Sequence, residues 1–477
     1  MNESIHDLLC RRAFLGRSAF GLGGLAATLL QQRSLAASWQ DRAARPSWQL
    51  PTAKAKRVVV IFLSGGLSQL DLFDEKPLLK ERRGEELPPS VRKGERISGL
   101  TERQGALPVV GSKFEFQDYG KCKLRMSELL PHLGEVADDL LLIRSLQSDH
   151  VLHEAAMTIL FTGTPLLGRP SWGAWTSYAL GDGKGNLPEF VVLLSNPDPA
   201  TPLHPRLWHN GFLAGRHQGV PFRGGKEPVL FVDNPPGVDK AARERQLQAL
   251  RELNEREARR SGDPDADARI AAYETAARMQ TSVPELADLK QEPPELLEEY
   301  GAEIGRPSFA NNCVLARRLL ERGVRFVQLF HQGWDQHGNL PQEITRQCQK
   351  TDRASAALLI DLERRGLLDD TLVVWGGEFG RTAYCQGKLT PTVYGRDHHP
   401  RCFTMWLAGG GVRAGHVHGA TDAFGYNIER DPVHVHDLHA TMLHLLGFDH
   451  ERLTWRFQGR DFRLTDVAGK VVRPLLA

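Results

Sequence analysis

Short apolar runs alternate with longer amphipathic stretches along most of the chain. The apolar runs are rich in β-branched and aromatic residues, which is typical of strands buried on both faces of a parallel sheet. They occupy residues 58–63, 140–145, 190–194, 324–330, 372–375 and 402–408. Helical spacing of apolar residues precedes two of these runs, at 311–321 and 353–365. The alternation predicts an α/β fold with a doubly wound, mostly parallel sheet and helices on both faces.

Three more helices are predicted outside these alternating units. They cover residues 126–138, 155–161 and 440–446. Asp437 is expected to be the N-cap of the last helix and Gly447 its C-cap.

The region 195–300 interrupts the pattern. It is rich in proline, histidine and glycine up to residue 239, and charged amphipathic helices are predicted at 240–260 and 266–279. We interpret the region as a helical insertion, or cap, over the carboxyl edge of the sheet that shapes substrate access. A surface helical hairpin with no role in chemistry is the alternative.

The first 37 residues have the features of an export signal. Arg11 and Arg12 are followed by Ala-Phe-Leu, an apolar run of about a dozen residues and small residues at 34–37. This order is typical of a twin-arginine signal peptide, and the apolar run is too short to span a membrane. The predicted organisation is a signal peptide at 1–37, a linker at 38–53 and one domain at 54–477. The protein is expected to use the twin-arginine export machinery and to reach the periplasm or the cell exterior.

Charge and cysteine content narrow the function classes. The formal net charge of the 477 residues is +2, and the arginine-rich stretch at 241–260 is interleaved with glutamate, so no nucleic-acid partner is predicted. Of six cysteines, Cys10 belongs to the signal, and the other five include no C-x-x-C pair. Neither a zinc knuckle nor a thioredoxin-type motif is supported. The thiols are expected to be free or buried.

Candidate functional residues gather next to three of the predicted strands. They follow the strands at 324–330 and 372–375 and precede the strand at 402–408. In chain order they are Asp335, His337, Glu378, Arg381, Asp397, His398 and His399. Open α/β sheets bind ligands at strand ends, and carboxylates, a guanidinium and imidazoles suit a metal-assisted site for an anionic ester. An ordinary polar loop residue is the alternative for any one of them taken alone.

Two further strands end in residues suited to binding. The first strand ends in Ser64-Gly65-Gly66, followed by Ser68 and Asp71. Backbone N–H groups and hydroxyls there would approach a bound ligand, and a glycine turn capped by Asp71 is the alternative. His150 and His153 follow the predicted strand at 140–145. Their spacing allows both to face one ion on a helical turn, and structural roles are the alternative.

The segment DTLVVWGGEFGRT resembles a strand and turn of sulfatases that have the sequence T-L-V-V-F-T-S-D-H-G. It is followed, as in sulfatases, by a segment like GGGVRAGHVHG and by a helix at 440–447 similar to P-T-L-L-x-L-x-G. Together with SGGLSQLDLFD, GRPSWGAW, WDQHGN, GRDHHP and LTDV, these motifs resemble an uncharacterised family of twin-arginine-exported, sulfatase-like proteins, a domain of unknown function. The resemblance covers nearly the whole chain. It implies the alkaline phosphatase-like superfamily, with its sulfatase-like fold and a divalent-metal site.

Only some of the metal-binding positions that the resemblance implies hold a possible metal ligand in this chain. Glu378 falls on a metal-binding Asp of sulfatases, but Phe379 falls on the neighbouring metal-binding His and Ser64 on another metal-binding Asp. His153 falls on the nucleophile. No C-x-P-x-R or S-x-P-x-R motif occurs in the chain, so a formylglycine sulfatase is not predicted.

The remaining correspondences complete the predicted site. Asp335 and His337 resemble Asp/His ligands of phosphatases and mutases, and His398 resembles the closing metal-binding His. The predicted metal ligands are Asp335, His337, Glu378, His398, His399 and His150. Arg381, assisted by Arg396, would hold a tetrahedral anion. The predicted residues near the substrate are Ser64, Ser68, Asp71 and Arg396.

The predicted function is hydrolysis of a phosphate or sulfate ester by metal-activated water, with His153 as acid/base or ligand. Nitrogen and oxygen ligands favour zinc or manganese and are compatible with calcium. The rival prediction is a catalytically inactive binding or scaffold protein for sulfated, anionic glycans. The missing nucleophile, Phe379 and Ser64 favour the rival, whereas buried charges without a partner are costly to keep. The sequence leaves the substrate and the oligomeric state open.

Overall fold

A nine-stranded sheet forms the centre of the computed structural model, which describes residues 46–94, 101–181, 186–222, 237–261, 279–280 and 282–477. The chain divides into two compact units, Met1–Gln49 and Leu50–Ala477, and all elements given below belong to the second. The strands lie in the order β12 (His416–His418), β4 (Leu140–Gln147), β11 (Phe403–Ala408), β8 (Thr371–Gly376), β1 (Arg57–Ser64), β7 (Phe326–Gln332), β5 (Phe190–Ser195) and β6 (Val220–Phe222). β15 (Val433–His434) also pairs with β4.

Every strand of this sheet except β11 runs in one direction. β1 pairs in parallel with β7 and β8, and β5 with β6 and β7, whereas β11 is antiparallel to both β4 and β8. The predicted α/β fold with a mostly parallel sheet is therefore confirmed. The expectation that residues 402–408 form a parallel strand is wrong. Burial on both faces produces the same apolar run in either direction, so composition carries no information on direction.

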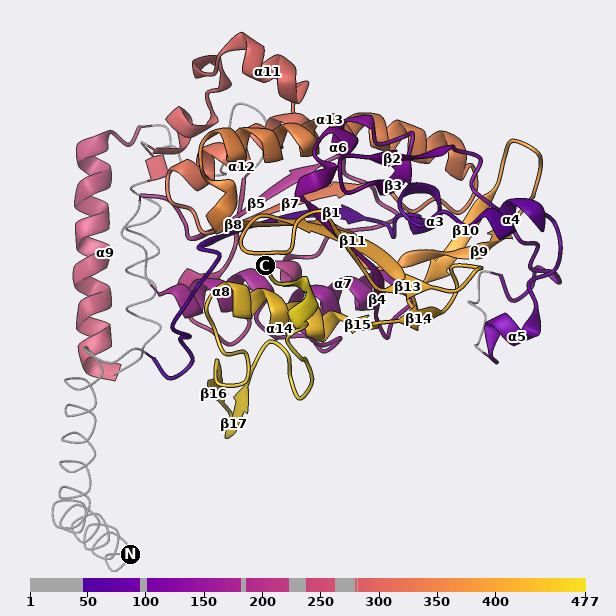
Figure 1. Cartoon of the computed structure of the whole chain (residues 1–477). Helices are drawn as coiled ribbons and strands as arrows, with labels where there is room; N and C mark the ends of the chain where they lie inside the picture. Colours follow the sequence, from indigo (N-terminus) through magenta and orange to yellow (C-terminus); the bar gives the residue numbers. More distant parts are fainter. Residues whose placement is uncertain (1–45, 95–100, 182–185, 223–236, 262–278, 281) are drawn as a thin grey trace, which may run out of the picture. The chain divides into compact units, whose positions relative to one another are not determined.

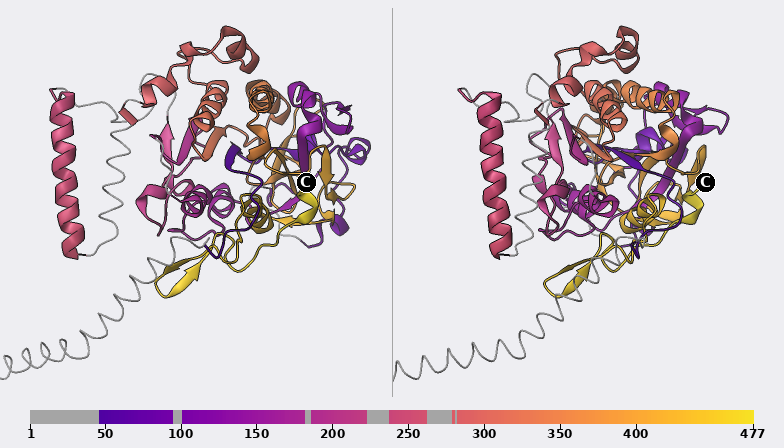
Figure 2. Two further views of the ribbon diagram at one scale, coloured as in Figure 1. Left: turned by 60° about the vertical axis from the view of Figure 1, so that its left-hand side comes forward. Right: turned by 90° about the vertical axis from the view of Figure 1, so that its left-hand side faces the viewer.

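Helices cover both faces of the sheet (Figures 1 and 2). One face carries α7 (His153–Thr162), α8 (Trp172–Leu180) and α14 (Val435–Leu445). The other carries α6 (Pro131–Glu135), α12 (Phe309–Glu321) and α13 (Leu340–Arg364), with α11 (Pro294–Tyr300) beside α12 and α13. The central strands are buried throughout because each lies between these two layers, as the residues of β7 and β8 show.

Smaller elements complete the described part of the chain. Further helices are α3 (Gln69–Leu72), α4 (Pro77–Glu81), α5 (Pro89–Arg92) and α9 (Lys240–Ser261), and residues 282–287 are also helical. Two-stranded ribbons are formed by β2 (Phe116–Tyr119) with β3 (Leu124–Ser127), β9 (Gly380–Gln386) with β10 (Gly395–His399), β13 (Ala420–Thr421) with β14 (Ile428–Arg430), and β16 (Trp455–Phe457) with β17 (Arg460–Phe462). Short 3-10 turns occur at Ala137–Asp139, Pro205–Leu207, Gly215–His217, Leu289–Gln291, Leu368–Asp370 and Arg473–Leu475.

Several helix predictions differ from the structure in their limits. The segment 126–138 contains the end of β3 and the short α6, because Pro131 starts a new helix there. α13 begins at Leu340, thirteen residues before the predicted start at 353. The prediction missed the first half of the helix because that half is largely polar. α14 is capped by His434 in a capping box, with Asp437 at the third helical position and not at the N-cap. The helix predicted at 266–279 lies, except for its last residue, outside the described residues.

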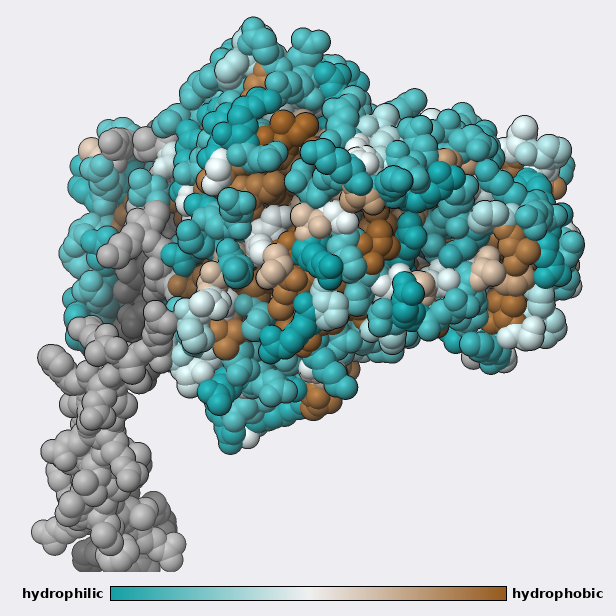
Figure 3. All heavy atoms as spheres, in the orientation of Figure 1, coloured by the Kyte–Doolittle hydropathy of each residue, from teal (hydrophilic) through white to brown (hydrophobic). Residues whose placement is uncertain are grey.

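Within the described residues, Cys122, Cys313, Cys348, Cys385 and Cys402 are free thiols, as predicted, and Cys10 lies outside them. No helix in the described ranges combines the length and apolar character needed to cross a membrane. The face in Figure 3 is mostly hydrophilic with separate hydrophobic patches.

Candidate metal centre

Three histidines converge on one oxygen of Asp335. The Nε2 atoms of His337, His398 and His153 lie 2.7, 3.1 and 3.2 Å from Asp335 Oδ1. These four residues form a group whose ligand atoms all lie within 4.8 Å of one another. Side-chain exposure is 12% for Asp335 and 27% for His337, so the group is accessible mainly from the side of His337.

The sheet topology explains why these residues meet. Asp335 and His337 follow β7, and His153 is the first residue of α7, which follows β4. β7 and β4 run in the same direction, so both deliver the residues that follow them to one edge of the sheet. His398 precedes β11 instead. It reaches the same edge because β11 is antiparallel and begins where β7 and β4 end.

Each of the three imidazoles is fixed through its Nδ1 atom. His398 Nδ1 lies 2.8 Å from the carbonyl oxygen of Val151, and His153 Nδ1 lies 2.6 Å from Glu378 Oε1. His337 Nδ1 contacts the side-chain oxygen of Gln386. Carbonyl and carboxylate oxygens only accept hydrogen bonds, so Nδ1 carries the proton and donates in each pair. Metal-binding histidines are held in this way by partners on the nitrogen that does not bind the ion.

The way His398 faces Asp335 favours a cation bound between them. With its proton on Nδ1, neutral His398 turns the lone pair of Nε2 toward a carboxylate oxygen 3.1 Å away. Burial lowers the pKa of His398 to about 4, which favours this neutral form. Two acceptors facing each other repel, and an ion bound by both would remove the repulsion. Imidazole nitrogen and carboxylate oxygen also form a donor set that zinc and manganese accept.

Asp335 remains ionised in this environment. Burial alone would raise the pKa of its carboxyl, but the contact with protonated His153 and the charge of Arg381 hold that pKa well below its usual range. The opposite effect occurs at His153. Burial would lower its pKa, but the two carboxylates beside it, Asp335 and Glu378, raise the pKa to about 9.

Arg381 lies beneath the cluster and is completely buried. Its guanidinium donates to Asp335 Oδ1 at 2.7 Å and to the carbonyl oxygens of Gly66, Arg396 and Trp334 at 2.6, 3.0 and 3.2 Å. It also contacts the carbonyl of Gly65. The Arg381 guanidinium was predicted to hold the substrate anion, but its N–H groups already donate to these oxygens. In this structure Arg381 instead orients Asp335 and joins the turn after β1 to the ribbon β9–β10.

Glu378 and Phe379 form the wall of the cluster next to β1. The Glu378 carboxylate is fully buried and accepts the backbone N–H of Gly65 at 3.0 and 3.3 Å, besides its contact with His153. Glu378 was predicted to be a metal ligand. It contacts the Nδ1 atom of His153 and is not one of the four grouped residues. The Phe379 ring lies 4.9 Å from His153 and 4.5 Å from His398, between centroids, and gives the cluster an apolar side.

Other predicted site residues lie outside the cluster. His399 is buried, and its Nε2 lies 2.7 Å from the carbonyl of Tyr426. His150 is half-buried before α7 and is not one of the four grouped residues. Ser64 lies inside the fold, with its hydroxyl 3.5 Å from the sulfur of Met157.

Asp71, Ser68 and Arg396 form a separate buried network. The carboxylate of Asp71 accepts from Ser68 at 2.6 Å, from Arg396 at 2.8 Å and from Tyr394 at 2.7 Å. Both Asp71 and Arg396 have fully buried side chains. The geometry therefore gives this network a structural position that holds β10 against α3, and none of its members is one of the four grouped residues.

Sequence reasoning missed Gln386 and the ribbon that carries it. β9 and β10 pair in antiparallel fashion with His398 opposite Arg381. The intervening segment is rich in Gly, Pro and Thr, a composition typical of a hairpin loop. A hairpin prediction would have placed Gln386, His398 and Arg381 on neighbouring strands.

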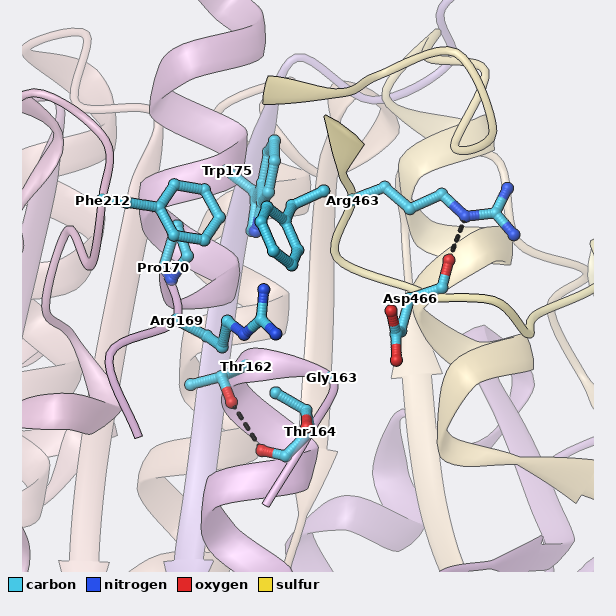
Figure 4. A pocket seen from close by; sticks show the side chains of 10 residues that line it. Thr162, Gly163, Thr164, Arg169, Pro170, Trp175, Phe212, Arg463 and Asp466 are labelled. Carbon is cyan, nitrogen blue, oxygen red and sulfur yellow. Dashed lines mark hydrogen bonds between the residues drawn. The ribbon is translucent and has the colours of Figure 1, made fainter. Parts of the chain in front are cut away.

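A second hollow lies at the other end of α7 (Figure 4). Arg169 points into it, with its guanidinium carbon 3.9 Å from the centroid of the Phe462 ring, and Trp175 and Phe212 form its walls. Its volume is about 10 Å³, which is room for about one water molecule. This hollow is therefore too small to hold an ester substrate.

Comparison with known proteins gives one family. Residues 55–476 match the model of a family described as "Protein of unknown function (DUF1501)". The chain has no match among curated proteins.

Three solved structures illustrate what the chain is similar to. Ps i-CgsB in complex with k-i-k-neocarrahexaose is 11% identical, with 83% of this chain and 72% of that chain covered and a TM-score of 0.36. The PsFucS1 sulfatase from Pseudoalteromonas sp. is 12% identical, with 83% and 68% covered and a TM-score of 0.33. A protein in the alkaline phosphatase superfamily from Vibrio parahaemolyticus is 10% identical, with 85% and 70% covered and a TM-score of 0.34. At these values no residue role is transferred to this chain.

Proposed function

Because the chain belongs to the DUF1501 family, described as proteins of unknown function, we propose its activity from its own site: it is a metal-dependent hydrolase of phosphate or sulfate esters. The observation that carries the proposal is the convergence of three imidazole Nε2 atoms on Asp335 Oδ1 within 3.2 Å. Asp335, His337 and His398 would hold the ion, which leaves a position for water or substrate, as in catalytic zinc sites. A divalent ion held there would supply Lewis acidity toward an ester oxygen and toward water.

The protein residues divide the remaining tasks. Gln386 and the Val151 carbonyl orient His337 and His398, and Arg381 orients Asp335. His153 is assigned to proton transfer, with the mobile proton at Nε2. Glu378 fixes its Nδ1 atom, which is the relation of base and orienting carboxylate found in other acid–base sites. Phe379 excludes water from one side of the cluster.

The proposed location is outside the cytoplasm, with residues 1–37 as a twin-arginine signal. These residues lie outside the described part of the chain, and the proposal is supported by their sequence alone. The proposed partners are an anionic ester or a sulfated glycan and the export machinery. Zinc or manganese is the favoured ion because histidine supplies most of the donors.

Metal analysis of protein purified without chelators tests the centre directly. We expect about one equivalent of a transition metal per chain in the unmodified protein. His398→Ala should lose at least tenfold in metal affinity, because it removes a ligand. His416→Ala is the control, since His416 lies on the edge strand β12, away from the cluster. Equal metal content in both variants would contradict the proposed ligand set.

Turnover assays then separate the hydrolase from a binding protein. The protein should hydrolyse members of a panel of phosphate monoesters, phosphate diesters and sulfate esters, and His153→Ala should lower the rate while the metal remains bound. A protein that binds metal and sulfated glycan but hydrolyses nothing in the panel would favour the binding role instead.

A further inference from the structure

A ligand-sized cleft lies at the carboxyl ends of β5 and β7, on the face covered by α12 and α13. Ser195 and His331, near the ends of the two strands, line it together with residues of both helices. Its volume is about 670 Å³, within the range of small-molecule sites. None of the four residues of the metal cluster lines this cleft.

The floor of the cleft is polar but uncharged. His331 Nε2 donates to Gln347 Oε1 at 2.9 Å, and His331 Nδ1 lies 3.2 Å from the hydroxyl of Ser195. Burial lowers the pKa of His331 to about 4, so the imidazole is neutral at physiological pH. The ring of Phe309 lies 5.2 Å from that of His331 and adds an apolar surface.

The rim of the cleft is positively charged. Lys350, Arg306 and Arg353 line it, together with one carboxylate, Glu303. Arg306 pairs with Glu303 at 3.2 Å, and Arg353 donates to backbone carbonyls at the end of α11. Lys350 donates to Asn196 Oδ1 at 3.0 Å and has no carboxylate within ion-pairing distance among the described residues. The cleft therefore has an excess of positive charge and one ammonium group whose charge is not neutralised.

Asn196, the partner of Lys350, has an unusual backbone. Its φ is +50°, in the left-handed region that asparagine adopts more readily than most residues other than glycine. The conformation is held by a hydrogen bond from Asn196 Nδ2 to the carbonyl of Gln332 at 2.6 Å. This conformation places the Asn196 amide oxygen beside Lys350 at the cleft.

We propose that this cleft binds a small organic anion, a sugar-sized molecule that carries a phosphate, sulfate or carboxylate group. Lys350 contacts the anionic group, and Asn196 and Ser195 offer hydrogen bonds to hydroxyls. The apolar side chains on the floor and walls contact the carbon skeleton. The first turn of α12, which also lines the cleft, adds a favourable potential for an anion.

Calorimetric titration of the full chain tests this site. The probes are glucose 6-phosphate, glucose 6-sulfate and glucuronate, with glucose as the neutral comparison. At least one anionic probe should bind tenfold or more tightly than glucose, and the tightest one identifies the anionic group. Lys350→Met should weaken this binding at least tenfold. Lys290→Met is the matched control, because Lys290 is exposed on a 3-10 turn outside the cleft, and it should leave the affinity unchanged.

Two further variants separate binding here from folding and from the metal centre. Asn196→Gly removes the amide and suits a left-handed backbone, so it should weaken binding without lowering the unfolding temperature by more than a few degrees. Asp335→Asn should leave binding of the probe unchanged. Absence of binding by all anionic probes, equal binding of glucose, or unchanged affinity in Lys350→Met overturns the proposal. Loss of probe binding in Asp335→Asn also overturns it and assigns the ligand to the metal centre.

Discussion

At the scale of single residues, the Nδ1 atom of His153 contacts one fully buried carboxylate, that of Glu378. Glu378→Gln keeps a side chain of the same shape but removes the charge beside His153 Nδ1. We expect turnover to fall by about 10–100-fold, the usual effect of removing an outer partner at a metal site, while metal content is retained. Steady-state kinetics and metal analysis measure the two quantities. Glu154→Gln is the control, since the Glu154 side chain is 67% exposed and pairs with Arg206. An equal loss in both variants would contradict a specific role for Glu378.

Gly65 limits how closely the turn after β1 can approach the cluster. Its φ is +127°, and a Cβ there would lie 2.3 Å from the backbone nitrogen of Asp335. Gly65→Ala should therefore destabilise the protein by about 3 kcal/mol or more, since both the backbone strain and the clash oppose folding. Gly84→Ala separates the two causes, because Gly84 has φ +85° but open space around its Cβ position. Denaturant unfolding should show a clearly smaller loss for Gly84→Ala, and equal losses would show that the clash is relieved.

At the scale of elements, apolar runs predicted the strands well because strands buried on both faces leave a strong signal. The same runs did not predict the direction of β11. Because β11 is antiparallel, His398, which precedes it, lies at the same edge of the sheet as Asp335. Alternation along a strand also separates neighbours such as His398 and His399. The sequence named both as ligands, and the register of β10 with β9 turns only His398 toward the cluster. Arg381 was named from its residue type, whereas its buried contacts depend on turns far apart in the chain.

The contact between α14 and α7 makes stability depend on pH. His439 on α14 is completely buried, its Nε2 donates to the carbonyl of Leu160 at 2.6 Å, and burial lowers its pKa from 6.5 to about 3. Between pH 6.5 and 3 the unfolded chain therefore binds the additional proton. Stability must fall with decreasing pH in this window, by up to about 1.4 kcal/mol per pH unit from this group.

His439→Phe removes this titration. The variant should be less stable than the unmodified protein at pH 7 by about 1 kcal/mol, because the hydrogen bond is lost. As the pH is lowered toward 4 this difference should vanish and then reverse, because only the unmodified protein loses stability through this group. Urea unfolding at several pH values measures both trends. His132→Phe is the control, since the His132 side chain is 42% exposed, and it should retain the slope of the unmodified protein. A constant difference between His439→Phe and the unmodified protein would contradict a buried neutral imidazole.

At the scale of the whole molecule, a metal that binds only the folded chain must raise the stability of the entire fold. The four grouped residues come from β10, the start of α7 and the loop after β7, so they meet only when the sheet is assembled. At an ion concentration one hundred times the dissociation constant, the gain is about 2.7 kcal/mol, which corresponds to an increase in unfolding temperature of roughly 3–5 °C. Chelator-treated protein should therefore unfold at a lower temperature and recover on addition of zinc or manganese. Asp335→Asn should show no such recovery, because the oxygen shared by the three histidines loses its charge. If Asp335→Asn recovered to the same extent as the unmodified protein, the stabilising ion would lie elsewhere in the chain, and the proposed centre would lose its main support.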